Sequence, residues 1–293
     1  MGVADWFGSF CKEVIVRDGG SISTRYQAIT RRLNTDYWST TSETAHSLYV
    51  GSYGRGTAIQ GFSDLDMIFQ LPYAIYQQYN AYQGNGQSAL LQAVKRSIEK
   101  TYSATSLKAD GQVILVPFTD GITFEVVPGF INKDDSYTHP DANVGGQWRT
   151  TNPRPEIAAI QQRNAACNGN LIQLCRMMRT WRKTWDVPIG GLLVDTLAYQ
   201  FIENYQYRDK SFLYYDFMCR DFFRWMADQD SSQAYWRAPG SGQYVYGKGL
   251  FQYKATRCYN LSREAIDHET AVPKREWSAK QKWREIFGTA FPN

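Results

Sequence analysis

Four segments in the first half of the chain are rich in β-forming residues: residues 46–50, 63–69, 112–118 and 122–127. Apolar and polar side chains alternate in the second of them. A two-residue period predicts strands that bury one face. Asp120-Gly121 separates the last two segments, and Asp-Gly between apolar runs favours a tight hairpin. Gly51, Gly54 and Gly56 follow the first segment and predict a turn there.

Most of the remaining chain has apolar residues every three or four positions, which predicts amphipathic helices. We expect helices within residues 5–16, 22–38, 88–103, 155–186, 187–205, 212–226, 262–268 and 278–288. Residues 132–154 are rich in Asp, Asn, Gly and Pro, and residues 238–249 in Gly and Tyr, so both predict loops.

Composition favours a globular protein without membrane or disulfide chemistry. The 293 residues are 43% hydrophobic, and no apolar run approaches the roughly 20 residues that span a bilayer. The N-terminus lacks the apolar core of a signal peptide, so we expect a cytoplasmic protein. Five scattered cysteines, none in a Cys-x-x-Cys pair, argue against a structural zinc site. The net charge of +4 suits polyphosphate ligands but is weak for a long nucleic acid.

Asp64 and Asp66 are the first candidates for chemistry. Residues i and i+2 of a strand point to the same face, so these two carboxylates lie side by side. Their repulsion is tolerated where cations bind. Mg²⁺ prefers hard oxygen ligands and is commonly shared with substrate phosphates, so the pair predicts a magnesium site.

Gly51 and Ser52 supply a second candidate site, and Ser52 lies 12 residues before Asp64. Glycine lets the backbone approach a ligand closely, and successive N–H groups at a turn that enters a helix bind anions. A phosphate-binding turn followed by a carboxylate metal site suits a nucleoside triphosphate. The alternative is an ordinary Gly-rich turn followed by a solvated acidic strand end.

Glu125 is the only acid in an otherwise apolar predicted strand. With Phe124 and Val126 facing the core, its side chain points the opposite way. Placed beside the strand of Asp64 and Asp66, Glu125 would complete a three-carboxylate cluster that ligates metal. The alternative is an edge-strand glutamate exposed to water.

The stretch GSYGRGTAIQGFSDLDMIF resembles the G-S…D-x-D signature of polymerase-beta-like nucleotidyltransferases, and more narrowly the bacterial cGAS-like CD-NTases, from about Tyr26 to the end of the chain. The resemblance implies a mixed α/β fold with two lobes. Residues 1–150 would form a nucleotidyltransferase lobe with N-terminal bracing helices, and residues 151–293 a mainly helical lobe. The ligand would bind in a cleft between them.

The resemblance also assigns residues to nucleotide binding. Arg179 matches the family's basic residue, commonly Lys, that contacts the donor triphosphate, and Lys183 lies on the same predicted basic face. Gly191 lies where many relatives have a phosphate-binding serine, so a backbone N–H would replace the hydroxyl. Tyr246, or Tyr244, could stack on a base. The family more often has Asp where this chain has Glu125.

The implied activity is synthesis of a cyclic oligonucleotide second messenger in anti-phage defence. Two Mg²⁺ ions, with Mn²⁺ as an alternative, would be held by Asp64, Asp66 and Glu125, and pyrophosphate would leave. We expect ATP and GTP as substrates, a product of the cyclic GMP-AMP type, a monomer, and a downstream effector that senses the product. Two alternatives stay open: a nucleotidyltransferase acting on RNA, protein or a small molecule, and a degenerate nucleotide-binding module.

Overall fold

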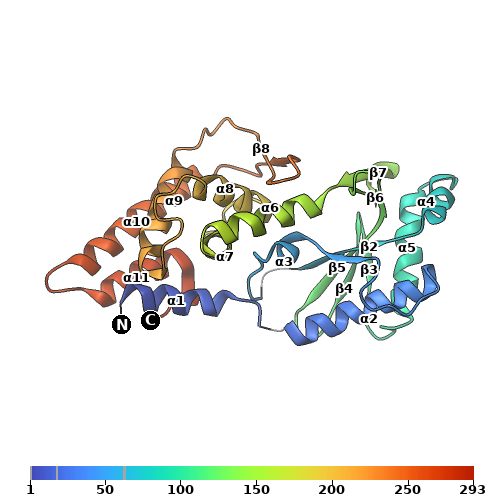
Figure 1. Ribbon diagram of the computed structural model, residues 1–293, viewed down its shortest axis with the longest axis horizontal. Coiled ribbons are helices and arrows are strands. Elements are labelled where there is room, and N and C mark those ends of the chain that lie inside the picture. The colour runs from blue at the N-terminus through green and yellow to red at the C-terminus, as the bar shows by residue number, and fades with distance from the viewer. Residues whose placement is uncertain (1, 18, 62–63) are drawn as a thin grey trace. The chain divides into compact units, whose positions relative to one another are not determined.

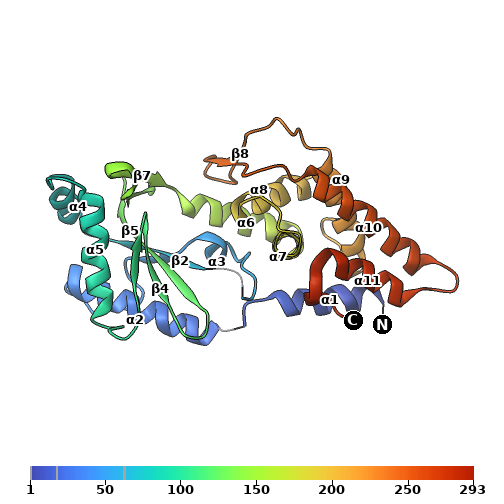
Figure 2. The same cartoon turned by 180° about the vertical axis from the view of Figure 1, so that it is seen from behind.

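The computed structural model describes residues 2–17, 19–61 and 64–293, and its chain forms two compact units (Figures 1 and 2). The sheet unit comprises Val16–Gly54 and Gly61–Arg154. The helical unit comprises Met1–Ile15, Arg55–Gln60 and Pro155–Asn293. The sequence suggested one boundary, between residues 150 and 151. In the structure the chain passes from the sheet unit to the helical unit for the last time between residues 154 and 155. The first helix belongs to the same unit as the C-terminal residues.

The sheet unit is built on a mixed sheet that has seven strands among the described residues. Its main order is β1-β2-β5-β4-β3, and β6 and β7 extend it from β5. β2 and β5 run parallel, and the other pairs are antiparallel. The strands are β1 (Ser47–Tyr49), β2 (Leu65–Gln70), β3 (Lys108–Asp110), β4 (Val113–Pro117), β5 (Thr123–Ile131), β6 (Tyr137–Asp141) and β7 (Gln147–Thr151).

One face of this sheet packs on the helices α2 (Gly19–Tyr37) and α5 (Gly86–Glu99) (Figure 1). Met67 of β2 and Val126 of β5 belong to this core and are completely buried. Because strand side chains alternate, Asp66 and Glu125 point to the opposite face. The described part of the unit also contains the short α-helices α3 (Gly51–Arg55) and α4 (Tyr73–Asn80). Helix α4 was not predicted.

The helical unit has a large apolar core in which both ends of the chain take part. Phe7 of α1 packs edge-on against Trp283 of α11, with ring centroids 5.1 Å apart. Figures 1 and 2 accordingly show α1 and α11 side by side. The unit's α-helices are α1 (Val3–Val14), α6 (Pro153–Ala166), α7 (Asn170–Thr184), α8 (Gly191–Ile202), α9 (Tyr215–Ala227), α10 (Gln252–Thr270) and α11 (Glu276–Phe287).

The predicted mixed α/β class, with a central mixed sheet and a helical part, is confirmed, but two predicted loops are wrong. Residues 132–154 contain the hairpin β6–β7, and residues 238–249 contain β9 (Tyr244–Tyr246), which pairs with β8 (Tyr235–Arg237). Because much of β7 and β9 is exposed, neither segment of the sequence shows a long alternation of apolar and polar residues. Ser63, where a strand was predicted to begin, lies outside the described residues. Of the helices described, none is both long and apolar enough to cross a membrane.

Candidate functional site

Asp66 and Glu125 are neighbours on adjacent strands. The parallel register of β2 and β5 pairs Asp66 directly with Glu125, and their carboxyl groups form a hydrogen bond. Asp64 lies exposed just before β2 and adds its negative charge to the environment of Glu125. The predicted placement of Glu125 beside the Asp66 strand is confirmed, and the catalytic roles of the three acids stay predictions.

Gly51 lies directly against the Asp66 carboxylate. The backbone of Gly51 has φ +58°, and a Cβ added there would lie 1.7 Å from Oδ2 of Asp66. The neighbouring N–H of Val50 donates to the Asp66 carbonyl oxygen at 2.9 Å. Gly51 and the buried Ser52 begin α3. Only a residue without a side chain therefore allows this turn to approach the carboxylate so closely.

Glu125 has a strongly perturbed pKa. Burial and the carboxylates of Asp66 and Asp64 raise the pKa of Glu125 from 4.5 to about 7. The charge of Asp110 raises the pKa of Glu125 as well. Near neutral pH, Glu125 can therefore either hold a proton or accept one, as a general base requires.

A divalent cation fits the donor chemistry of these acids. Neighbouring carboxylates are stabilised by a hard cation, and Asp66 and Glu125 would hold Mg²⁺, with Asp64 able to contribute. Across residues 2–17, 19–61 and 64–293, however, no three acidic, His or Cys side chains are arranged to hold a metal ion together. The acids are thus close enough to interact but are not a preassembled three-ligand site.

We expect the stability of the metal-free protein to fall as pH rises from about 5 to 8. Native Glu125 keeps its proton up to about pH 7, whereas the unfolded carboxyl group loses it near 4.5. Between these values the unfolded state binds fewer protons, so raising the pH favours unfolding. Solvent screening of the half-buried group reduces the expected loss to about 1 kcal/mol. Urea denaturation at pH 5.5 and pH 8 should show this loss in the wild type and not in Glu125→Gln, and equal losses would contradict the assignment.

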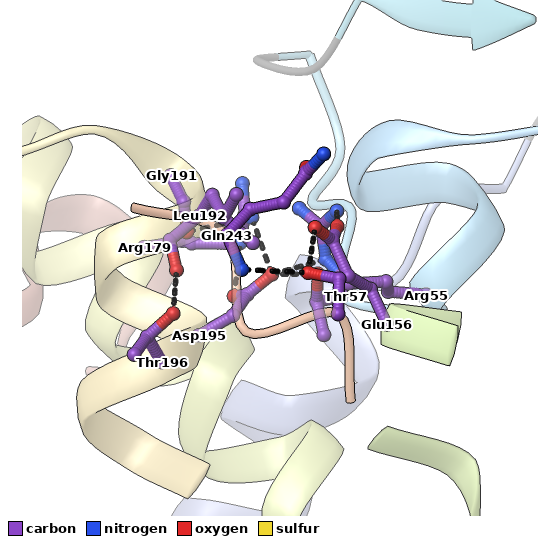
Figure 3. Close-up of polar contacts among 10 residues, drawn as sticks. Arg55, Thr57, Glu156, Arg179, Gly191, Leu192, Asp195, Thr196 and Gln243 are labelled. Atoms are coloured by element: carbon purple, nitrogen blue, oxygen red, sulfur yellow. Dashed lines mark hydrogen bonds and ion pairs between the residues drawn. The ribbon is translucent and has the colours of Figure 1, made fainter. Parts of the chain in front are cut away.

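Arg179, predicted to bind the triphosphate, is buried in the helical unit and bound by a carboxylate (Figure 3). Its Nε donates to Oδ1 of Asp195 at 2.9 Å, and its Nη2 donates to Oδ2 at 2.8 Å. Nη2 also donates to the carbonyl oxygen of Gly191 at 3.0 Å. The structure thus brings Arg179 and Gly191 together, as the prediction of a shared site requires, but engages the guanidinium with protein groups.

Lys183 and Tyr246 lie elsewhere in the helical unit. Lys183 is exposed near the end of α7 and lines a cavity of about 430 Å³ whose lining residues do not include Arg179. Tyr246 is 62% exposed on β9, in contact with the rings of Tyr235 and Tyr244. Their assignment to nucleotide binding stays a prediction.

Sequence reasoning missed the partners of Arg179. Arg55, Thr57 and Asp195 form one buried group, although Arg55 and Asp195 are 140 residues apart. A signal was present: Asp195 is the only charged residue in the apolar helix α8, GLLVDTLAYQFI. Because a buried carboxylate requires donors or a cation, an isolated acid in such a helix predicts a paired charge.

Comparison with known proteins agrees with this architecture. Residues 1–164 match the SMODS family, described as the Second Messenger Oligonucleotide or Dinucleotide Synthetase domain. The chain is also 24% identical over 217 residues to a probable cyclic nucleotide synthase of Bacillus cereus strain VD146. That match covers 70% of this chain and 60% of the relative, so the chain spans less than two thirds of the relative's length.

Solved structures of CD-NTases have the same fold. CdnC of E. coli MS115-1, in complex with HORMA-deltaN, matches with a TM-score of 0.70 and 14% identity, covering 99% of this chain and 98% of that chain. CdnG of Bradyrhizobium diazoefficiens, in complex with GTP, matches with 0.68 and 12%, covering 97% and 94%. The cyclic AMP-GMP synthase DncV of Vibrio cholerae matches with 0.63 and 14%, covering 84% and 69%. Because residues 1–164 are more than half of the 293 residues, this chain belongs to the Second Messenger Oligonucleotide or Dinucleotide Synthetase family.

Proposed function

We propose that this protein is a nucleotidyltransferase that joins ribonucleoside triphosphates into a cyclic oligonucleotide and releases pyrophosphate. The observation that carries the proposal is the juxtaposition of Asp66, Glu125 and Gly51. Two carboxylates meet on adjacent parallel strands, and a glycine turn lies against one of them. A phosphate-binding turn beside acidic residues that suit a cation is the arrangement that nucleotidyl transfer needs.

In the proposed reaction, a ribose hydroxyl attacks the α-phosphorus of a second nucleotide. A new oxygen–phosphorus bond forms, and the bond to the leaving pyrophosphate breaks. Glu125, as a ligand of the cation, would be deprotonated, and the hydroxyl proton leaves to solvent water. The N–H groups at Gly51 and Ser52 would bind and orient phosphate oxygens. Mg²⁺ held by Asp64, Asp66 and Glu125 would supply positive charge that stabilises the developing charge on phosphate.

We further propose that the product is a cyclic dinucleotide of the GMP-AMP type, made from ATP and GTP. Supporting this are a structural relative named as a cyclic AMP-GMP synthase and others whose structures hold ATP or GTP. A second transfer between the two nucleotides would close the ring. As the family's name states, such a product is a second messenger, so we propose that a separate effector recognises it in anti-phage defence.

The test is incubation of the purified protein with all four ribonucleoside triphosphates and Mg²⁺ or Mn²⁺, then phosphatase treatment and mass spectrometry. We expect a phosphatase-resistant cyclic product that contains guanine and adenine. A linear product, or nucleotide attached to RNA, protein or a small molecule, would show that the protein catalyses another nucleotidyl transfer and not cyclisation. Binding of triphosphate without pyrophosphate release, with either metal, would favour a non-catalytic nucleotide-binding module.

A further inference from the structure

The carboxylate of Asp195 lies at the centre of a buried polar cluster in the helical unit, which Figure 3 shows. Its Oδ1 accepts from Nε of Arg179 at 2.9 Å. Its Oδ2 accepts from Nη2 of Arg179 at 2.8 Å, from Nε of Arg55 at 3.0 Å and from the Thr57 hydroxyl at 2.8 Å. Since the side chain is 0% exposed, the carboxylate cannot rotate without breaking several of these bonds.

Asp195 is the acid that balances the positive charges of both arginines in the cluster. Burial favours the neutral acid, but the guanidiniums of Arg179 and Arg55 offset this and hold the pKa of Asp195 below its ordinary value. Glu156 of α6, 3.5 Å from Nη1 of Arg55, is the second acid of the cluster and accepts a hydrogen bond from Ser241 at 2.9 Å. Asp195 contacts both guanidiniums, whereas the ion pair of Glu156 is with Arg55.

Gly191 provides the space that the Arg179 guanidinium occupies. A Cβ added to Gly191 would lie 2.7 Å from Nη1 and 3.0 Å from Nη2 of Arg179. The carbonyl oxygen of Gly191 meanwhile accepts from Nη2. Asp195 lies four residues later on the same helix, so one turn of α8 holds the guanidinium at two points.

We propose that Asp195 is a positioning residue for triphosphate binding, because it fixes the plane and location of the Arg179 guanidinium. The inference rests on the proposed function and on the prediction, implied by the family resemblance, that Arg179 binds the donor triphosphate. A planar guanidinium recognises phosphate through directed N–H groups, so its orientation matters more than that of a lysine ammonium. Orienting it before the ligand arrives reduces the loss of side-chain entropy on binding.

The test measures the dissociation constant of a non-hydrolysable ATP analogue with Mg²⁺, together with KM and kcat for triphosphates. Asp195→Asn keeps the size of the side chain and removes its charge, and it should weaken analogue binding at least tenfold and raise KM similarly. It should change kcat by less than threefold. The matched control, Glu156→Gln, removes the other acid of the cluster and should stay within twofold of the wild type. All measurements are made below the melting temperature of each variant.

A merely structural role predicts a different result. If Asp195→Asn lowers the melting temperature but leaves the dissociation constant within twofold, the proposal is overturned. If Asp195 acts through Arg179, adding Asp195→Asn to Arg179→Met should weaken binding no further, and an additional tenfold loss would also overturn it. Should Asp195→Asn not fold, Asp195→Glu, which displaces the carboxylate by one methylene, is judged by the same criteria.

Failure of the proposed function gives a distinguishable outcome. If the wild type binds the analogue but yields no cyclic product, the proposed product is wrong, and the dissociation constants still decide the role of Asp195. If the wild type binds no triphosphate, both proposals are overturned.

Discussion

Replacing Asp64 and Asp66 together by Asn should lower product formation by at least about 10³-fold, equivalent to about 4 kcal/mol of transition-state stabilisation. Asparagine has the shape of aspartate but not its charge, so the acids could no longer hold a divalent cation beside the phosphate. The fold should survive, because removing a carboxylate beside Glu125 relieves repulsion that raises the pKa of Glu125. Mass spectrometry of the product and thermal denaturation in metal-free buffer would measure the two effects.

Asp110→Asn is the matched control for this double variant. Asp110 is also an acid whose charge raises the pKa of Glu125, but it lies on β3 and is paired with Lys108 at 3.3 Å. Its replacement should change the rate less than threefold. Wild-type turnover by the Asp64→Asn, Asp66→Asn protein would refute the assignment of these acids to catalysis.

The sequence predicted the face of the sheet on which Glu125 lies, because buried strands have a strict two-residue period. Phe124 and Val126 are both completely buried, which leaves the side chain of Glu125 on the other face. The Asp120-Gly121 turn correctly predicted the hairpin of β4 and β5. Periodicity does not, however, specify which strands become neighbours, and the resemblance to a known family supplied that step.

The hairpin β6–β7 could not be predicted in the same way. Along Gln147–Thr151 no residue is fully buried, so this strand has no apolar face that would give a two-residue pattern. Polar contacts hold it instead: Arg149 forms an ion pair with the buried carboxylate of Asp141 across the two strands. Backbone hydrogen bonds and ion pairs of this kind produce no regular pattern of apolar residues in a sequence.

The basic face predicted for α7 shows a further limit. Arg179 and Lys183 are one helical turn apart, which suggested a common surface. Arg179 is 7% exposed and Lys183 is exposed, because the facing helix α8 covers the first position with Asp195. A row of basic residues on a helix predicts that their side chains lie on one face. It does not predict which of them forms an ion pair with a carboxylate from a distant segment.

Gly51→Ala should be a strongly damaging single-methyl change in the sheet unit. The new Cβ would lie 1.7 Å from Oδ2, 2.5 Å from Cγ and 2.9 Å from Cβ of Asp66, so the carboxylate or the turn must move. A left-handed backbone also costs a residue with a side chain about 1–2 kcal/mol, and overpacking adds about 1–3 kcal/mol. We expect a loss of about 3 kcal/mol in the free energy of unfolding, measured by urea denaturation. Activity should fall by at least about a hundredfold, because the moved carboxylate no longer faces the turn that we propose to bind phosphate.

Gly111→Ala separates backbone strain from the collision with Asp66. Gly111 has the same φ of +58°, but the nearest atom to an added Cβ is the side-chain nitrogen of Asn143 at 3.0 Å, which can move away. This control should therefore lose only the backbone cost of about 1–2 kcal/mol and keep its activity. In addition, Asp66→Ala removes the two atoms nearest to the new methyl group, so Gly51→Ala should destabilise the Asp66→Ala protein less than the wild type. Equal destabilisation in both backgrounds would mean that the turn does not lie against Asp66, and the proposed arrangement of phosphate turn and carboxylates would have to be abandoned.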